Sequence, residues 1–414
     1  MSDVAECRSC GSSELHPFLS LGKTPLADAL VKPGFDFKLE ERFPLDVAFC
    51  ANCSLVQLLE EVPADKMFVD NYLYFSSFSD ELLRHSRENV LRLIAERQLG
   101  PSSLVVEVAS NDGYLLKNFA EFGVPVLGVD PAPDQAAAAN AAGVPTLARF
   151  FGSELADELV AQGKRADVIV ANNVMAHVPG LNDVMAGVAT LLADDGVVVI
   201  ENPYVRDLID HVEFDTIYHE HLCYHSCTAI DRLAARHGLT LNHVENFPRL
   251  HGGTLRWHLS KGTHRSAAAT AFLESEEASG LTSLAYYQGF AKRVQHVRTA
   301  LHELLEGLRR DGKTIAAYGA AAKGSTLVNT VGLDTDLVDF VVDRNVHKQG
   351  LLMPGTHQPI LDPSALVERR PDYVLLLAWN FKDEIMAQQH EYVALGGQFI
   401  VPVPEPMIVT GPTR

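Results

Sequence analysis

From Ser103 onward, short apolar runs alternate with amphipathic stretches. The apolar runs are LVVEVA, PVLGVD, ADVIVANNVMAHV and GVVVIENPY, and the helix-like stretch YLLKNFAEFG follows the first of them. Alternating strand and helix patterns of this kind indicate a parallel sheet with crossover helices. The pattern therefore predicts a doubly wound α/β domain over residues 76–265.

A second alternating region occupies the C-terminal part of the chain. A long helical stretch, residues 283–312, precedes the apolar runs TIAAYG, LVDFVVD, YVLLLAWN and QFIVPVP. The spacing of these runs again favours a parallel sheet. We expect linker helices and a second Rossmann-like α/β domain over residues 266–414.

Residues 1–75 show neither pattern and are rich in turn residues. They hold two CxxC pairs, formed by Cys7, Cys10, Cys50 and Cys53. Four thiolates in two close pairs can complete a tetrahedral Zn²⁺ site with no open position for a substrate. We therefore expect a small domain with a structural zinc ion. The two other cysteines, Cys223 and Cys227, are expected to pack in the interior.

Composition narrows the class of partner. The chain has 414 residues, of which 47% are hydrophobic and 21% charged, and a formal net charge of −19. This charge would repel a phosphate backbone, so we expect neither nucleic acid nor an anionic membrane as a partner. No apolar run approaches the roughly 18 to 20 residues of a membrane span, and the first residues lack a signal-peptide pattern. A cytoplasmic protein is expected.

The stretch VVEVASNDGYLL predicts a strand, a turn and the start of a helix at a cofactor site. Glu107 lies at the strand end and Gly113 where a ligand would approach the backbone, while Asp130 ends the next strand and could accept from both ribose hydroxyls. The turn lacks a GxGxxG run and carries Asn111 and Asp112 instead. Because a cationic sulfonium suits acidic and carbonyl groups, this favours S-adenosylmethionine (SAM) over NAD.

This arrangement resembles class I methyltransferases, with Ala109 where that family often has its first glycine. The resemblance implies adenine stacking on Phe150 or Phe151 after the third strand, for which plain core packing is the alternative. It also implies a cofactor contact from Asn172 or Asn173 at the end of the fourth strand.

The stretch FDTIYHEHLCYHS is dense in proton-transfer groups, namely Tyr218, His219, Glu220, His221 and His225. Packing alone rarely requires such a cluster. The HEH triplet lacks the i, i+4 histidine pair of zinc proteases, so a second metal is not expected. His177 follows the fourth strand and is predicted at the same sheet edge as the cofactor, and Tyr72 could cap the pocket. Structural roles are the alternatives for both.

The C-terminal stretch YGAAAKGST predicts a strand, a small-residue turn and a helix. Its backbone amides, with Lys323 and Ser325, could receive a diphosphate. The same turn could bind NAD, which would make the protein an oxidoreductase. The stretch DRNVHKQG adds polar side chains that could line a cleft or form a solvated loop, namely Arg344, Asn345, Lys348 and Gln349.

The order of the motifs resembles one family over nearly the whole chain. CxxC…CxxC, NYLYFSS, EVASNDGYLL, FDTIYHEH, HGGTLR and YGAAAKGSTL follow one another as in the nucleotide-sugar C-methyltransferases, which methylate a carbon of a 4-keto deoxysugar. The resemblance implies a second α/β domain that helps to hold the nucleotide sugar, and it favours a monomer. The implied pocket residues are Tyr72, His177, Tyr218, Glu220 and His221.

This resemblance suggests a mechanism in which His221 removes the proton beside the ketone, since imidazole titrates near neutrality. Tyr218 and His177 would stabilise the enolate oxygen, and Glu220 would orient a histidine or contact a sugar hydroxyl. The expected reaction is methylation at C3 of a dTDP sugar. The alternatives are methylation at C5, enolisation without methyl transfer as in an epimerase, and a non-catalytic zinc-containing assembly protein.

Overall fold

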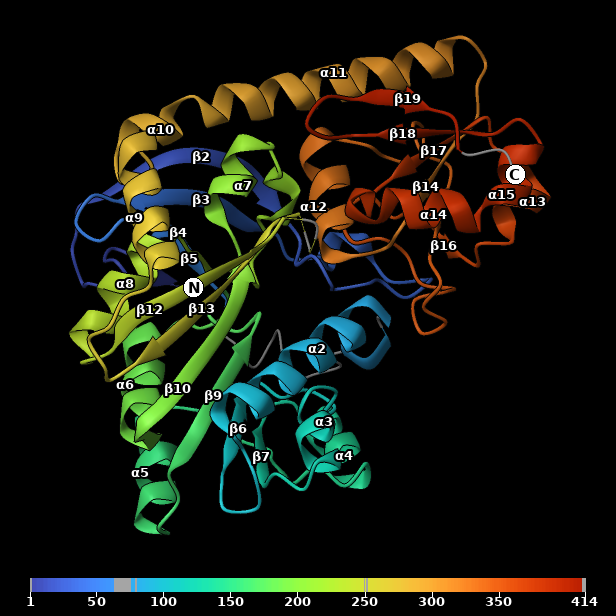
Figure 1. Cartoon of the computed structure of the whole chain (residues 1–414). Helices are drawn as coiled ribbons and strands as arrows, with labels where there is room; N and C mark the ends of the chain where they lie inside the picture. The colour runs from blue at the N-terminus through green and yellow to red at the C-terminus, as the bar shows by residue number, and fades with distance from the viewer. Residues whose placement is uncertain (1, 63–75, 79, 249, 251, 412–414) are drawn as a thin grey trace.

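The computed structural model describes residues 2–62, 76–78, 80–248, 250 and 252–411. Three regions follow one another along the chain, each built around a sheet (Figure 1). The predicted fold class, a zinc module followed by two α/β domains, is confirmed. Tyr72 lies outside the described residues.

The N-terminal module is an antiparallel sheet with strand order β11-β4-β3-β2. Its strands are β2 (Leu15–Thr24), β3 (Phe43–Cys50), β4 (Val56–Leu58) and, from the middle of the chain, β11 (Cys223–Tyr224). A separate pair joins β1 (Ser2–Asp3) to β5 (Glu60–Glu61), and a 3-10 helix, η1 (Phe37–Leu39), lies in the loop between β2 and β3. The stretch FDTIYHEHLCYHS, residues 214–226, holds most of the predicted catalytic residues and is called the catalytic stretch below. Its strand β11 completes the sheet of the zinc module.

The middle sheet has the order β12-β13-β10-β9-β6-β7-β8, with β13 antiparallel to both of its neighbours. Its strands are β6 (Val105–Val108), β7 (Val126–Val129), β8 (Thr146–Leu147), β9 (Ala166–Asn172), β10 (Leu192–Pro203), β12 (Thr240–Phe247) and β13 (Thr254–Ser260). Every residue of β6 is buried, as expected for a central strand covered on both faces. The strand order reverses beside β6, which is where ligands bind in open α/β sheets.

Helices cover both faces of this sheet and connect its strands. They are α2 (Asp80–Arg97), α3 (Leu116–Glu121), α4 (Pro133–Ala141), α5 (Ser153–Ala161), α6 (Leu181–Leu191), α7 (Val205–Asp210), α8 (Cys227–Arg236) and α9 (Ala267–Ser279). A 3-10 helix, η3 (Phe214–Thr216), begins the catalytic stretch.

The C-terminal sheet has the order β16-β15-β14-β17-β18-β19, parallel except for β19. Its strands are β14 (Ile315–Tyr318), β15 (Val341–Val342), β16 (Ile360–Leu361), β17 (Tyr373–Leu376), β18 (Gln398–Val401) and β19 (Met407–Val409). Its helices are α12 (Ala322–Val331), α13 (Ala365–Arg369), η4 (Trp379–Phe381), α14 (Lys382–Gln388) and α15 (His390–Ala394).

The predicted long helical stretch forms α10 (Leu284–Gln288) and α11 (Phe290–Arg310), which spans the top of the molecule from the zinc module to the C-terminal sheet (Figure 1). Its buried side chains recur at helical spacing, at Phe290, Val294, Val297, Leu301 and Leu305. One continuous hydrophobic core includes residues of all three regions. The three regions therefore pack against one another through a shared core.

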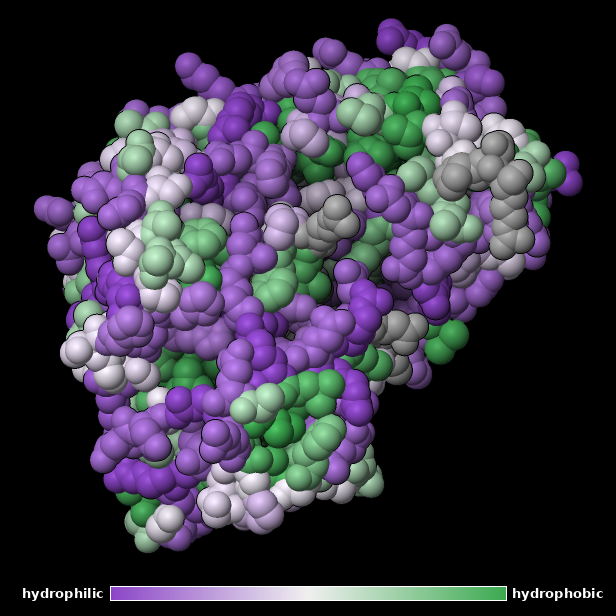
Figure 2. Space-filling view, in the orientation of Figure 1, coloured by the Kyte–Doolittle hydropathy of each residue, from purple (hydrophilic) through white to green (hydrophobic). Residues whose placement is uncertain are grey.

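One face of the molecule is drawn by residue hydropathy in Figure 2. On this face, hydrophilic residues predominate and hydrophobic ones form separate groups. Among the described residues, no helix is both long and apolar enough to cross a membrane.

Glu276 on α9 fixes the start of α8, the helix that follows the catalytic stretch. It is fully buried, and its carboxyl oxygens accept hydrogen bonds from the Cys227 amide (2.7 Å), the Thr228 amide (2.8 Å) and hydroxyl (2.6 Å), and the Tyr204 hydroxyl (2.9 Å). Acidic groups are favoured at helix N-termini, where backbone N–H groups lack partners within the helix.

We expect Glu276→Ala to lower the midpoint of thermal unfolding by about 5 °C or more, because buried donors lose charge-assisted partners. Glu277→Ala, at an exposed position of the same helix, is the control and should leave the midpoint nearly unchanged. Equal midpoints for the two variants would contradict this role for Glu276.

Candidate active site

The turn after β6 is held in an unusual backbone conformation by Asp130. Ala109, Asn111 and Gly113 have positive φ angles of 53°, 49° and 77°. The Asp130 carboxylate accepts from the Asn111 amide at 2.8 Å and from the Ala132 amide at 2.9 Å. Asp130, predicted as a ribose ligand, thus also braces the turn, and each of its oxygens retains a second lone pair.

Buried polar atoms line this edge of the sheet without protein partners. Glu107 Oε2, Asp112 Oδ1 and Asn172 Oδ1 have no hydrogen-bond partner among the described residues. Burial, together with the nearby Asp130 and Asp112, raises the pKa of Glu107 well above its ordinary value. Unpaired buried polar atoms usually indicate a bound partner. Their chemistry fits SAM, which offers ribose hydroxyls and two cationic groups.

The two phenylalanines that could stack on adenine differ in their exposure to solvent. Phe151 is buried in the core, whereas Phe150 is 59% exposed. Asn173, the alternative to Asn172, has a φ of 55° and donates its amide to the Glu201 carbonyl at 2.7 Å. The cofactor role of each of these residues stays a prediction.

The catalytic candidates meet at the same sheet edge. His177 lies in the loop that leaves β9, and its ring centroid is 4.8 Å from that of His221, with the rings nearly perpendicular. The Tyr218 ring lies 4.0 Å from the His221 ring. Backbone contacts join the catalytic stretch to the ends of two strands. The Cys223 amide donates to the Ala176 carbonyl, in the loop after β9, at 3.1 Å. Tyr204, which follows β10, forms a β-bridge with His225.

The hydrogen bonds of His221 define its tautomer. Nδ1 lies 2.9 Å from the Thr216 carbonyl oxygen, which can only accept, so Nδ1 carries the proton. Nε2 then holds a lone pair and accepts from the Tyr218 hydroxyl at 2.8 Å. In the neutral ring, the basic nitrogen therefore lies against a phenol.

Burial keeps the neighbouring groups uncharged at neutral pH. Desolvation lowers the pKa of His177 and of His225 to about 4. Desolvation also raises the pKa of Glu220 to about 8, with a contribution from the charge of Asp28. His177 and Glu220 are thus neutral groups that can donate hydrogen bonds, while His225 donates to the Met175 carbonyl at 3.0 Å and serves as an anchor.

The zinc module covers the other side of the catalytic stretch. The Leu58 amide donates to the Leu222 carbonyl at 2.9 Å, and β11 pairs with β4. His219 lies 3.0 Å from the Pro44 carbonyl oxygen through Nε2, and its ring meets Phe43 edge-on. His219 is therefore an anchor to the zinc module.

The four predicted metal ligands lie together. The Sγ atoms of Cys7, Cys10, Cys50 and Cys53 are all within 4.8 Å of one another. The Cys7–Cys53 and Cys10–Cys50 separations are 3.4 and 3.6 Å. Thiolates bound to one tetrahedral zinc at about 2.3 Å lie roughly 3.8 Å apart, so the donor set fits zinc with no open position.

Three family profiles match consecutive parts of the chain. They are described as "Putative zinc binding domain" at residues 7–68, "Methyltransferase domain" at residues 79–244 and "C-methyltransferase C-terminal domain" at residues 249–404. The C-methyltransferase NovU of Streptomyces niveus is 37% identical over 410 residues, which cover 98% of this chain and 97% of NovU. The chain belongs to the C-methyltransferases.

Similarities to solved structures are weaker. The magnesium protoporphyrin IX methyltransferase of Synechocystis with bound SAM is 15% identical, covering 48% of this chain and 89% of that chain with a TM-score of 0.34. The CcbJ methyltransferase of Streptomyces caelestis is 16% identical, covering 42% and 88% with a TM-score of 0.32. The family assignment rests on the profiles and on NovU: the protein is a SAM-dependent methyltransferase with a zinc-binding domain.

In this C-methyltransferase, the predicted diphosphate residues gather around the N-terminus of α12. Lys323 Nζ lies 4.4 Å above the Trp379 ring and donates to Asn380 at 3.2 Å. Lys348 Nζ donates to the Ala320 carbonyl at 2.7 Å. Arg344 is exposed and lies 3.6 Å from Glu384.

The link between this region and the catalytic stretch was not predicted from the sequence. Trp379 Nε1 donates to the fully buried Asp215 at 2.6 Å, and Asp215 precedes Thr216, the residue that holds His221. Asp215 Oδ1 and Ser325 Oγ are buried without hydrogen-bond partners among the described residues. A buried acidic residue just before the YHEH motif is the nearest hint in the sequence.

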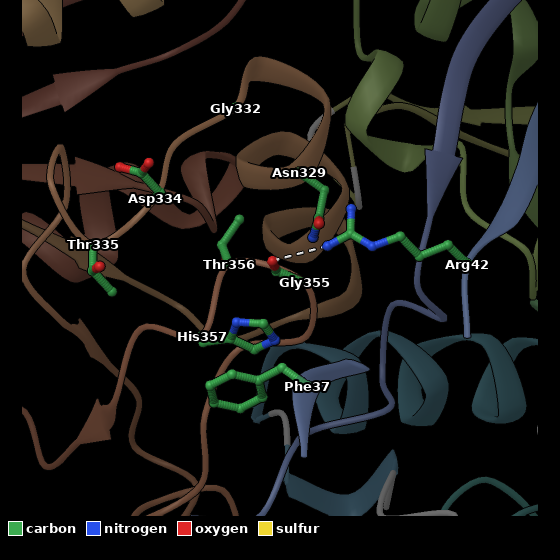
Figure 3. A pocket seen from close by; sticks show the side chains of 9 residues that line it. All are labelled: Phe37, Arg42, Asn329, Gly332, Asp334, Thr335, Gly355, Thr356 and His357. Atoms are coloured by element: carbon green, nitrogen blue, oxygen red, sulfur yellow. Dashed lines mark hydrogen bonds between the residues drawn. The ribbon is translucent and has the colours of Figure 1, made fainter. Parts of the chain in front are cut away.

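A cavity of about 550 Å³ lies elsewhere, between the zinc module and the C-terminal domain (Figure 3). The Phe37 ring stacks on His357 with centroids 3.7 Å apart, and Arg42 donates to the Gly355 carbonyl at 3.1 Å. None of the catalytic or cofactor candidates lines it. The predicted active site at the sheet edge is therefore separate from this cavity.

We expect Glu220→Gln to gain stability relative to the wild type as pH rises from about 6 to about 9. A folded pKa of about 8, above the ordinary value of 4.5, means that the folded protein binds more protons than the unfolded chain between these values. Glu220 therefore stabilises the fold at low pH and loses this contribution as pH rises, whereas glutamine does not titrate.

Thermal unfolding midpoints measured over this pH range test the expectation. Glu277→Gln, at an exposed position, is the control and should follow the wild type at every pH. A difference between Glu220→Gln and the wild type that does not change with pH would show that Glu220 titrates normally.

Proposed function

We propose that the protein methylates a carbon next to the ketone of an NDP-linked 4-keto deoxysugar, with C3 of a dTDP sugar as our assignment. The observation that carries the proposal is the Tyr218–His221 pair at the cofactor edge of the methyltransferase sheet. Methyl transfer to carbon needs a base that makes the carbon nucleophilic, and a neutral imidazole provides one. NovU, similar over nearly the full length, is a C-methyltransferase.

The proposed base is Nε2 of His221. Because Nδ1 donates its proton to the Thr216 carbonyl, the neutral ring has its lone pair on Nε2. The tautomer that a base requires is then present before substrate binds. When Nε2 takes the proton from carbon, the Tyr218 oxygen at 2.8 Å can accept from the new N–H. The Tyr218 hydroxyl can then donate a hydrogen bond to the enolate oxygen, which keeps its negative charge until the methyl group is transferred. Bound SAM supplies the electrophilic methyl group.

Two neutral groups would assist the developing negative charge. His177 stays uncharged because desolvation lowers its pKa to about 4, and its one N–H, which now bonds to the Glu220 backbone, would have to turn to the enolate. Glu220 stays protonated because burial raises its pKa to about 8, and it can donate to the enolate or to a sugar hydroxyl. In oxyanion sites, each fixed hydrogen-bond donor lowers the activation free energy by about 3 kcal/mol.

The C-terminal domain would hold the diphosphate. The first residues of α12 are mostly small, and Lys323 and Lys348 flank the start of this helix. Arg344 and Ser325 are the further candidates. Lys323 already contacts Trp379, whose bond to Asp215 leads to the catalytic stretch, so a nucleotide bound here would direct its sugar towards His221.

Mass spectrometry of products tests this function. We expect purified protein with SAM and a panel of NDP-4-keto-6-deoxysugars to add one methyl group to one of them, with NMR of the product locating it at C3. Parallel reactions in D₂O report proton exchange at the same carbon. A methyl group at C5 would correct the position. Deuterium uptake without methyl gain would favour an epimerase-type reaction, and no change with any sugar would contradict the proposal.

We expect His221→Asn to abolish turnover while SAM affinity stays within about twofold, because removing a general base typically costs roughly 10²- to 10⁴-fold in rate and His221 is not among the cofactor candidates. His264→Asn, at an exposed position, is the control. Turnover of His221→Asn near the wild-type rate would remove His221 from the role of base.

A further inference from the structure

The catalytic stretch ends as a strand of the zinc module. Cys223 of β11 is opposite Gln57 of β4, and Tyr224 is opposite Val56. Val56 lies three residues after Cys53, one of the four metal ligands. The chain that runs from the metal site therefore forms hydrogen bonds directly with the segment that carries His221.

Gln57 makes a second connection between the metal site and β11. It is fully buried, its Oε1 accepts from the Arg8 amide at 2.8 Å, and its Nε2 donates to the Glu6 carbonyl at 3.3 Å. Glu6 and Arg8 flank the metal ligand Cys7. One buried side chain thus ties the first CxxC turn to the strand that pairs with Cys223.

Polar groups of the methyltransferase domain hold the same turn from outside. Asn182 of α6 donates its amide to the Ser9 carbonyl at 2.8 Å and to the Arg8 carbonyl at 3.2 Å. Its Oδ1 accepts from His237, which ends α8, the helix that begins directly after the catalytic stretch. Arg236 of α8 also donates to the Ser9 carbonyl at 2.8 Å.

We propose that the closed four-cysteine cluster positions the catalytic stretch, and that Gln57 is the positioning residue that connects the two. The cluster fixes the CxxC turn, Gln57 fixes β4 to that turn, and β4 fixes β11. The side-chain hydrogen bonds of Gln57 lie within the zinc module, whereas the turn after β6 is held by Asp130. The kinetic part of the inference rests on the proposed function; the structural connection does not.

The variant Gln57→Met removes both hydrogen bonds at nearly constant volume and leaves all four cysteines in place. A second variant, Asn182→Asp, places an acceptor where Asn182 now donates to two carbonyls, and it serves if the buried change prevents folding. The matched control is Arg265→Ala, which removes the 2.7 Å ion pair to Asp231 of α8 without touching the zinc module.

Hydrogen exchange measured by mass spectrometry tests the connection without any substrate. We expect faster exchange over residues 217–226 in Gln57→Met and Asn182→Asp, and no change over residues 103–115 or in Arg265→Ala. Zinc content should stay at one ion per chain in all three proteins. Unchanged exchange over residues 217–226 in both variants would overturn the proposal, whatever the enzyme proves to methylate.

Kinetics separate positioning from a merely structural role. We expect Gln57→Met to lower kcat by about 10-fold to 100-fold, to shift the pH profile of kcat, and to leave the Kd for SAM within about twofold. A lower unfolding midpoint with unchanged kcat and pH profile would overturn the positioning role. Loss of SAM binding in parallel with kcat would also overturn it, since the change would then reach the whole domain.

Discussion

The short pairing of β4 with β11 is the contact on which the rest of the active site depends. It fixes Cys223 and Tyr224 against the zinc module, while Ser226 caps the helix that follows and Glu276 holds its first amides. The segment between η3 and α8 is therefore restrained at its C-terminal end by a sheet and a helix start. A loop held in this way can keep Tyr218 and His221 in contact without substrate, as preorganised catalysis requires.

Burial then determines the chemistry that these side chains can perform. The same enclosure lowers the pKa of His177 and raises that of Glu220, so both are neutral at pH 7. Neutral donors suit a reaction in which charge appears only as the substrate loses its proton, because they stabilise the enolate without an attached counter-charge. The acidic side chains Asp112 and Asp130 lie at the predicted SAM edge, and the basic side chains Lys323 and Lys348 lie at the C-terminal domain.

The sequence predicted the elements that have a local signal. Buried parallel strands such as β6 and β9 are mainly apolar runs, and a CxxC pair is a metal motif by its spacing alone. It did not predict β11, because a two-residue strand has no periodicity and its partner lies about 165 residues earlier in the chain. The Asp215–Trp379 bond was missed for the same reason. Asp130 was expected only as a ligand, since its backbone bonds depend on how the turn folds.

The two restraints on the catalytic segment come from different domains. The C-terminal domain holds its start through Asp215, and the zinc module holds its end through Cys223, with His221 between them. The nucleotide recognition proposed for Lys323 and Lys348 can therefore change while the proposed base, His221, stays in place, provided that Trp379 keeps its bond to Asp215. The zinc module is less free to change, because β4 pairs directly with β11, the strand that follows His221. Differences in the nucleotide that relatives with this architecture recognise should accordingly lie in the C-terminal domain rather than in the CxxC turns.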